Sequence, residues 1–364
     1  MTNKEKQVLE IIKKHPTIEQ SEIARLLNIK RSTVAVHISN LIKRGYIKGK
    51  GYIINDDQYI VGIGSCNVDV YGKALIPIKK QYDHPARINS SIGGVMYNII
   101  ANYTLLSGKG KLITAYSDDI YGEAIVKEAL FKNIDISESL FIENKSSGMF
   151  MQIMDDNNDM HLAICDMEIL HSIDVDFIDG KKHILVNSEC VIVDPSLNDD
   201  VIQRIIDICK NKVDIYVDPI SDNYARKMKK YLHEIFLIKP NITELEILAN
   251  QKISDDDSLY KACEKLLEKG VKKVVVSLSE NGILYMDKDI SIKRKLKEEK
   301  RMVNASGAGD ALMASLIYGH VHGFELDKIV DYSLAAGIAA IRSQNTINDK
   351  MSIDLLENIL KEKK

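Results

Sequence analysis

The sequence predicts an α/β protein whose main domain is a doubly wound, mostly parallel sheet with a small β lid, preceded by a small helical domain. From residue 58 onward, short runs rich in Val and Ile alternate with amphipathic helical patterns, as in parallel sheets covered by helices on both faces. Two segments, about residues 73–92 and 147–167, break this alternation and have the pattern of strands joined by turns. Residues 1–55 show three helical patterns and a hairpin instead.

Composition is that of a globular cytoplasmic protein. The 364 residues are 45% apolar and 28% charged, which suggests two or three domains. No run of eighteen apolar residues occurs and the amino terminus has no apolar signal core, so we expect neither a membrane span nor export. The scattered cysteines form no CxxC pair, which indicates a reducing compartment, no zinc site and small buried thiols at Cys66, Cys165, Cys190, Cys209 and Cys263.

Charge is distributed unevenly along the chain. Residues 1–55 contain eleven Lys or Arg and four Asp or Glu, a net charge of +7. Because the whole chain carries −3, the remaining residues carry −10. A basic segment on an acidic body indicates a module that binds a polyanion.

The basic segment has a regular organisation. Apolar residues at helical spacing predict a helix that ends at His15, a second over 17–29, and a third that is capped by Ser32 and stops at Gly45. Alternating residues over 46–54 then predict a hairpin.

This arrangement resembles a winged helix-turn-helix domain. The resemblance implies that the third helix lies in the major groove of DNA and that the hairpin is a wing on the backbone. The implied contacts are Arg31, Ser32, Thr33 and His37 on the helix and Lys48 and Lys50 on the wing. One module makes few contacts, so we expect a homodimer. The alternative is a helical appendage with a solvated basic face.

Polar residues gather at the ends of the predicted strands in the main domain. Ligands of parallel α/β sheets bind beyond the carboxyl ends of the strands, so we expect the site there. These ends carry Asn67, Asp69, Asp194, Asp218, Lys239, Asn241 and Ser277. The second lid segment is apolar through Met149, Met151, Met154 and Met160, which favours core or dimer contact over substrate contact.

The stretch "SSIGGVMYN" places Gly93 and Gly94 before an apolar helix with Asn98 one turn in. Paired glycines let a ligand approach the backbone closely, and Asn98 can face the same ligand. A tight turn before a helix explains the glycines equally well.

The stretch "KPNITELE" follows a predicted strand with Lys239 and Asn241, and a helix begins directly after them. Asn241 and Glu244 could together hold a hydrated Mg²⁺, which takes few protein ligands. The alternative is a capping role for Thr243 and Glu244.

The stretch "VNASGAGDALMAS" is the most specific. Backbone N–H groups at a glycine-containing helix start form an anion site, which the helix dipole strengthens. Asp310 in the first turn cannot bind that anion, because both are negative, but it can accept the proton of a hydroxyl that attacks phosphorus. The same dipole is expected to keep Asp310 ionised at neutral pH.

In this order, the three motifs resemble those of the PfkB-type carbohydrate kinases, which have the ribokinase-like fold, over residue 59 to the carboxyl terminus. The resemblance implies a kinase that uses ATP and Mg²⁺, with Asp310 as catalytic base. It implies a substrate site of Asn67, Asp69, Gly93, Gly94 and Asn98. It implies ATP and anion contacts from Lys239, Asn241, Ser277, Gly282, Gly307, Ala308, Gly309 and Asn345, with Asn241 and Glu244 organising magnesium through water.

Two positions depart from the ribokinase pattern. Asn304 and Ala305 stand where an Asp-Thr pair usually helps to bind a monovalent cation, which leaves dependence on such a cation doubtful. Val95 stands where ribokinases carry a lysine that meets the free sugar, which suits a bulkier substituent. With "LIKPN" and "VNxxGAGDA", these features resemble the pseudouridine kinase branch, which phosphorylates the 5′-hydroxyl of that nucleoside.

Two other functions stay open. The chain could phosphorylate another nucleoside or ribosyl sugar, or it could be a transcription regulator that uses the kinase fold as a ligand sensor. Candidates to read the base are Asp194, Asp218 and Ser221.

Overall fold

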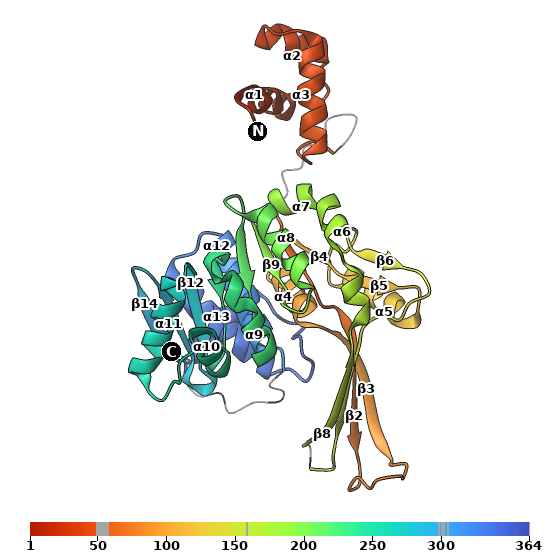
Figure 1. The fold of residues 1–364 in the computed structure, drawn as a ribbon, viewed down its shortest axis with the longest axis vertical. Helices are drawn as coiled ribbons and strands as arrows, with labels where there is room; N and C mark the ends of the chain where they lie inside the picture. Colours follow the sequence, from red (N-terminus) through yellow and green to blue (C-terminus); the bar gives the residue numbers. More distant parts are fainter. Residues whose placement is uncertain (49–57, 158, 298, 300–302, 304–305, 364) are drawn as a thin grey trace.

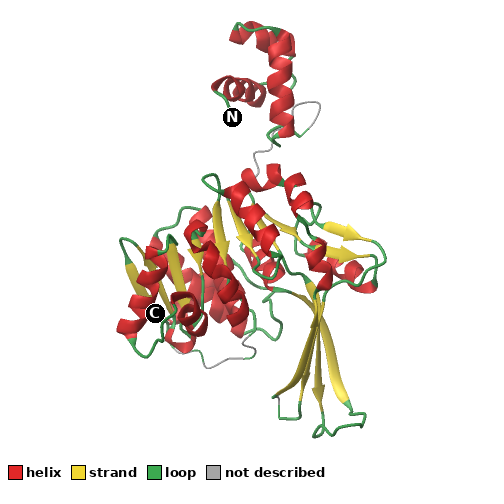
Figure 2. Ribbon diagram, in the orientation of Figure 1, coloured by secondary structure: helices red, strands yellow, loops and turns green. Residues whose placement is uncertain are grey.

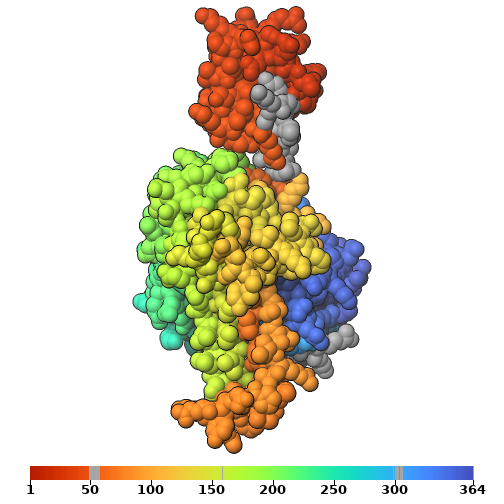
Figure 3. Space-filling view, turned by 90° about the vertical axis from the view of Figure 1, so that its right-hand side faces the viewer, coloured from red at the N-terminus to blue at the C-terminus, as the bar shows by residue number. Residues whose placement is uncertain are grey.

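The computed structural model describes residues 1–48, 58–157, 159–297, 299, 303 and 306–363. A small helical head stands at one end of a larger α/β body, and a narrow sheet of long strands projects from the opposite end (Figure 1). The side view shows the same order of head, body and projecting strands (Figure 3).

The head consists of the three predicted helices, α1 (Asn3–Lys14), α2 (Gln20–Leu27) and α3 (Arg31–Lys43). Their apolar stripes meet in a small core that includes Val8, Ile23 and Val34. Gly45, with φ +75°, follows the end of α3 as predicted. The predicted cap at Ser32 is wrong, because Lys30 precedes the first turn and no side chain caps the helix. The predicted wing, with Lys50, lies mostly outside the described residues.

The main sheet has eight strands in the order β14-β13-β12-β11-β10-β9-β1-β4. The predicted strand runs form its parallel part together with β4, and β13 and β14 add an antiparallel edge. Their bounds are β1 (Ile60–Ile63), β4 (Gly110–Ile113), β9 (Cys190–Val193), β10 (Asp214–Val217), β11 (Leu237–Ile238), β12 (Lys273–Ser277), β13 (Ile283–Asp287) and β14 (Ser291–Arg294).

Helices cover both faces of this sheet, which confirms the doubly wound fold (Figure 2). One face packs on α6 (Val175–Gly180), α7 (Lys182–Val186), α8 (Asp199–Cys209), α9 (Asp222–Met228), α10 (Ile242–Ala249), α11 (Asp256–Glu268) and the 3₁₀ turns η1 (Glu168–Ser172) and η2 (Lys229–Glu234). The other packs on α4 (Val95–Leu105), α5 (Ile120–Phe131), α12 (Ala308–Val321), α13 (Leu326–Ile341) and α14 (Ile353–Lys363). Successive strand residues alternate between the two cores: Ile60 joins one, and Val61 and Ile63 join the other.

The projecting lid is a four-stranded sheet in the order β3-β2-β7-β8. Its strands are β2 (Asn67–Ala74), β3 (Ala86–Gly93), β7 (Met149–Met154) and β8 (Met160–Asp166), and β7 and β8 form the predicted antiparallel hairpin. The register places Asp69 and Tyr71 on one face, and Val70, Met151 and Ile164 on the other. A separate pair, β5 (Ala115–Ser117) and β6 (Leu140–Ile142), lies at the edge of the body.

The structure can be compared with two expectations from composition, buried cysteines and no membrane span. All five cysteines are free, and four are buried as predicted, but Cys165 is exposed because it lies on β8 of the lid. Among the described ranges, no helix has both the length and the hydropathy needed to cross a membrane.

Candidate functional site

The candidate site lies where the carboxyl ends of β1, β9, β10, β11 and β12 meet the first turns of α4, α10 and α12. A hydrogen bond of 2.8 Å from Asn98 Nδ2 to Asp310 Oδ2 joins α4 to α12 across 212 positions of sequence. The glycine pair and the glycine-rich turn, distant in the chain, are therefore brought to one point.

The loop after β1 is fixed by a buried carboxylate. Asp194 Oδ2 accepts hydrogen bonds from the backbone N–H of Ser65 at 2.8 Å and from its hydroxyl at 2.6 Å. Asp194 Oδ1 accepts two more, from the N–H and the hydroxyl of Ser196, at 2.8 and 2.5 Å. Both oxygens of this predicted base-reading candidate are thus committed to protein donors, which anchor the loop that leads into β2.

The paired glycines make room for protein atoms. Gly94 has φ +101°, and a Cβ there would lie 2.7 Å from the carbonyl oxygen of Ser65. A Cβ on Gly93 would lie 2.1 Å from Asp69 Oδ2. The pair therefore lets the lid carboxylate and the loop after β1 pack against the start of α4.

Asn67 and Asp69 face each other at the base of the lid. The Asn67 amide donates to Asp69 Oδ1 at 2.6 Å, and Asn67 is buried. Burial raises the pKa of Asp69, while the bond from Asn67 lowers it, so the net shift is upward. Two adjacent oxygen-rich groups of this kind can bind vicinal hydroxyls of a sugar.

Asn98 offers an unused acceptor. Its side chain is 5% exposed, and its Oδ1 atom has no hydrogen-bond partner among the described residues. A buried polar atom without a partner is costly, and a ligand hydroxyl would satisfy it.

Asp310 is the acidic group in the first turn of α12. Burial raises its pKa to about 7, the nearby Asp218 adds to this, and the bond from Asn98 and the charge of Lys239 oppose it. The expectation that the helix dipole keeps it fully ionised at pH 7 is therefore wrong, because burial opposes the dipole. A carboxylate with this pKa can exchange a proton near neutral pH.

Lys239 brings the positive charge to the site. Its side chain is 5% exposed, and its Nζ atom lies 2.8 Å from Asp218 Oδ2. The same Nζ would lie 3.3 Å from a Cβ on Gly309, so the ammonium sits beside the glycine turn. Gly307 opens this turn with φ +79°, which leaves N–H groups at the start of α12 free to meet an anion.

Asn241 and Glu244 form a capping box on α10. The Glu244 N–H donates to Asn241 Oδ1, and the Asn241 N–H donates to Glu244 Oε2, both at 2.9 Å. The possible cap at Thr243 is therefore wrong by two positions, since the strand leaves Asn241 extended. Burial raises the pKa of Glu244. The second carboxylate oxygen, Oε1, accepts no bond from the capping box, so this buried oxygen group fits a magnesium-bound water.

The predicted nucleotide contacts Ser277, Gly282 and Asn345 come from three separate elements. Ser277 ends β12 and pairs with Asn241 in an isolated parallel bridge. Gly282, with φ +85°, turns the chain from η3 (Ser279–Asn281) into β13. The loop after α13 touches the glycine turn, because a Cβ on Gly307 would lie 2.2 Å from the carbonyl oxygen of Thr346. Asn345 precedes this contact.

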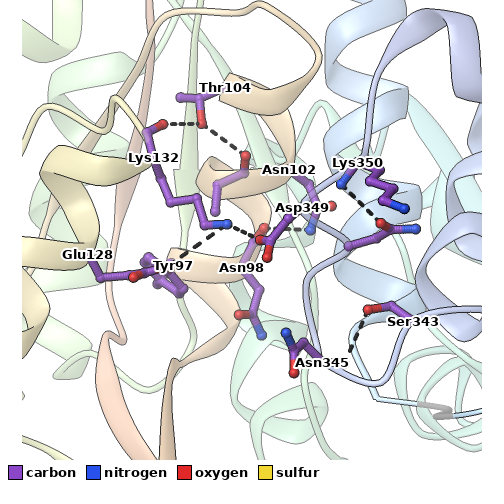
Figure 4. Close-up of polar contacts among 12 residues, drawn as sticks. Tyr97, Asn98, Asn102, Thr104, Glu128, Lys132, Ser343, Asn345, Asp349 and Lys350 are labelled. Atoms are coloured by element: carbon purple, nitrogen blue, oxygen red, sulfur yellow. Dashed lines mark hydrogen bonds and ion pairs between the residues drawn. The ribbon is translucent and has the colours of Figure 1, made fainter.

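An ion pair between a buried lysine and an exposed aspartate connects the Asn345 loop to α5, which in turn contacts α4 (Figure 4). Lys132 pairs with Asp349 of the loop and lies 3.9 Å from Glu128. Glu128 in turn accepts a bond of 3.3 Å from the Tyr97 hydroxyl on α4. Glu128 and Lys132 belong to α5 and its carboxyl-terminal cap, whereas Asp349 lies 217 positions after Lys132, so no local sequence pattern predicts this connection. Asn304 and Ala305, the predicted departures, lie outside the described residues.

The predicted DNA contacts lie on or near α3. Arg31, Ser32 and Thr33 are exposed on its first turn, and Lys48 is exposed after it. His37 is half-buried and its Nδ1 atom is enclosed without a partner among the described residues, so it lies at the rim of the exposed face. Val36 on α3 is also exposed, at 58%, and was not among the predicted contacts. Its position outside the apolar stripe of the helix could have identified it.

Comparison with known proteins gives two family matches. Residues 57–353 match the pfkB family of carbohydrate kinases, and residues 1–48 match the winged helix-turn-helix DNA-binding family. YeiI of Escherichia coli K12, an uncharacterized sugar kinase, is 31% identical over 97% of this chain and 98% of its own. The pseudouridine kinase of the same organism is 26% identical over 84% and 98%. The crystal structure of a protein proposed to be a sugar kinase, from Clostridium perfringens, aligns with a TM-score of 0.78 and 30% identity over 85% and 98%.

Proposed function

The chain belongs to the pfkB family of carbohydrate kinases, and on that premise we propose that it transfers the γ-phosphoryl group of ATP to the 5′-hydroxyl of a nucleoside, pseudouridine. The observation that carries the proposal is the 2.8 Å bond between Asn98 and Asp310. It puts a candidate hydroxyl-binding amide and a candidate base at one point, beside an anion-binding turn.

In the proposed reaction, Asp310 accepts the proton of the 5′-hydroxyl as that oxygen attacks phosphorus. The N–H groups of Gly307, Ala308 and Gly309, with the Lys239 ammonium, meet the transferring phosphoryl group. Glu244 and Asn241 would hold magnesium through water, and the ion would supply positive charge to the phosphates. Ser277, Gly282 and Asn345 surround the rest of the nucleotide. In this assignment, the carboxylate of Asp310 accepts the proton and the ammonium of Lys239 meets the negative phosphoryl group.

Three features support a nucleoside as acceptor. Asn67, Asp69 and the unpartnered oxygen of Asn98 offer hydrogen bonds to ribose hydroxyls. Val95, the first residue of α4, puts an apolar side chain directly after the glycine pair, which suits an acceptor with a bulky substituent on the ribose. The 26% identity to a pseudouridine kinase covers nearly all of that enzyme.

The proposal predicts a ranking of acceptors. With Mg²⁺ and ATP, we expect the highest kcat/KM for pseudouridine among pseudouridine, uridine, cytidine, adenosine, guanosine, inosine and ribose. Formation of ADP and of the 5′-phosphate, followed by chromatography, measures it. Inertness toward pseudouridine with turnover of another acceptor would establish the alternative, a kinase for another nucleoside or a ribosyl sugar.

The raised pKa of Asp310 predicts a pH dependence. Since the base must be ionised and burial raises its pKa to about 7, kcat/KM for the acceptor should rise with pH up to about 7 and then level off. Below this pH the rate should fall about tenfold per unit, because one proton blocks the base. Initial rates from pH 5 to 9 at fixed free Mg²⁺ measure it. A flat profile across this range would contradict the assignment of Asp310.

We further propose that residues 1–55 form a DNA-binding head on a kinase domain of residues 58–364, and that the chain acts as a homodimer. Exposed Arg31 on α3 and the match to DNA-binding winged helices support the head. One face of the lid is apolar and exposed, with Ile164 56% exposed. This supports the proposal that a second copy of the chain covers it.

The head predicts salt-sensitive DNA binding. Upstream DNA should shift in a gel at low salt, with affinity falling steeply as salt rises, because phosphate contacts release counterions. Arg31→Ala should weaken the shift, and Lys6→Ala, an exposed cation on α1, should leave it nearly unchanged. Light scattering gives the number of chains per complex. No shift at low salt would remove the proposed role of the head, and a shift that depends on nucleoside would favour a regulator with a sensing kinase fold.

A further inference from the structure

The site contains one buried ammonium among several carboxylates. Lys239 is within electrostatic reach of Asp218, Asp310 and Glu244, and in the described part of the chain only Asp218 is bonded to it, at 2.8 Å. A buried ammonium needs a partner, since its desolvation is costly. The choice of partner therefore decides which carboxylate stays unpaired.

A strained turn fixes that choice. Asp218 Oδ1 accepts the backbone N–H of Ile220 at 3.1 Å, which aims the other carboxylate oxygen at Lys239. Ile220 has φ +65°, a conformation that β-branched residues rarely adopt, and Ser221 N–H closes a tight turn onto the Pro219 carbonyl at 2.7 Å. Strain of this kind persists where the surroundings require it, and it is common at functional sites.

We propose that Asp218 is a positioning residue for phosphoryl transfer, which holds the Lys239 ammonium beside the glycine turn of α12 and keeps it from pairing with Asp310. The proposal rests on the proposed kinase reaction. The ammonium then stays where the γ-phosphoryl group arrives. Asp310, which accepts a hydrogen bond from the neutral amide of Asn98, keeps its affinity for a proton.

The charges around Asp310 support this arrangement. Asp218 and Asp194, at the ends of β10 and β9, raise its pKa, whereas Lys239, after β11, lowers it; α4 contributes only the neutral Asn98. Replacing Asp218 with asparagine removes a negative charge and frees the ammonium to pair with Asp310. Both effects lower the pKa of the base, and the second also draws the ammonium away from the phosphoryl group.

The pH–rate profile of Asp218→Asn tests the proposal. We expect the acidic limb of kcat/KM to move down by about one pH unit or more, because a cation within 4–6 Å lowers a carboxyl pKa by about 1–3 units. At pH 8, kcat should fall about tenfold or more, since both the base and the ammonium are impaired, while KM for the acceptor stays close to that of the wild type. Asp222→Asn, an exposed acid four positions along, is the matched control and should keep the wild-type profile. A Asp218→Asn profile with an unmoved acidic limb would overturn the proposal.

A second measurement does not need turnover. Because the pKa of Asp310 is raised in the folded state, this group lowers stability as pH rises from about 4 to about 7. The melting temperature of Asp310→Asn, relative to that of the wild type, should therefore increase as pH rises through that window. Above the window the difference should stay constant. In the Asp218→Asn background, the increase in this melting-temperature difference should end at a lower pH. An increase over the same pH range as in the wild-type background would contradict the proposal. If no acceptor is phosphorylated, the kinase proposal fails, while this measurement still decides the role of Asp218.

Ile220→Gly covers the case in which Asp218→Asn does not fold. It relaxes the turn and leaves every charge in place, because glycine adopts positive φ freely. A shift of the acidic limb in the same direction, smaller than that expected for Asp218→Asn, supports the proposal. A wild-type profile in Ile220→Gly would show that the turn does not control the partner of Lys239.

Discussion

Replacing Asp310 with asparagine is expected to lower kcat by about 10²- to 10⁴-fold, the usual contribution of a general base. The amide keeps the shape of the carboxylate and can still accept the bond from Asn98, so binding of the acceptor and of ATP should change little. Steady-state rates with pseudouridine, and calorimetric titration with a nonhydrolysable ATP analogue, separate the two effects.

The fold of this variant should be intact. Removal of a half-buried carboxylate with a raised pKa relieves a destabilising charge above pH 7, so the melting temperature should be equal or higher there. Asp200→Asn, an exposed acid in the first turn of α8 at the same edge of the sheet, is the control and should keep wild-type kcat. Near-normal turnover by Asp310→Asn would assign the proton to another group.

Lys239→Met is expected to cost both activity and stability. Loss of one preorganised charge at the phosphoryl group should lower kcat by about 10²- to 10³-fold. The change also leaves Asp218 buried without its cation, and breaking such a pair costs about 3–5 kcal/mol. Urea unfolding at pH 7.5 measures the stability, and initial rates at saturating ATP measure kcat.

The double variant Asp218→Asn/Lys239→Met separates these effects. It buries no unpaired charge at this position, so it should recover most of the stability lost in Lys239→Met, because neutral replacements of a buried pair are often tolerated. Its activity should stay low, since the ammonium is still missing. A double variant as unstable as Lys239→Met would mean that the pair is not the source of the lost stability.

The order of elements and the position of the site could be predicted because they depend on local patterns. Val- and Ile-rich runs mark the parallel strands, and glycines beside polar residues mark the turns at their ends. The antiparallel strands β13 and β14 were not predicted, since an edge position depends on neighbours distant in sequence. Cys165 was expected to be buried because its residue type favours burial, although its segment was predicted to belong to the lid, where β8 leaves the side chain exposed.

Side-chain partners were the least predictable part of the site. Both Asn241 and Thr243 are good helix caps, and only the backbone geometry at the end of β11 selects Asn241. The helix dipole suggested an ionised Asp310, whereas burial and Asp218 raise its pKa. The Asp218–Lys239 pair joins residues 21 positions apart in sequence, each directly after one of two neighbouring strands, and no spacing rule relates them.

The close fit of Gly93 against Asp69 also constrains how this sequence can change over generations. Any side chain at position 93 would collide with the carboxylate at position 69, 2.1 Å from its nearest oxygen. A shorter residue at 69 would remove the obstacle but would also remove the group proposed to bind a hydroxyl. The two positions are therefore epistatic: a descendant that takes a new substrate can fill position 93 only after it has given up the acid at 69.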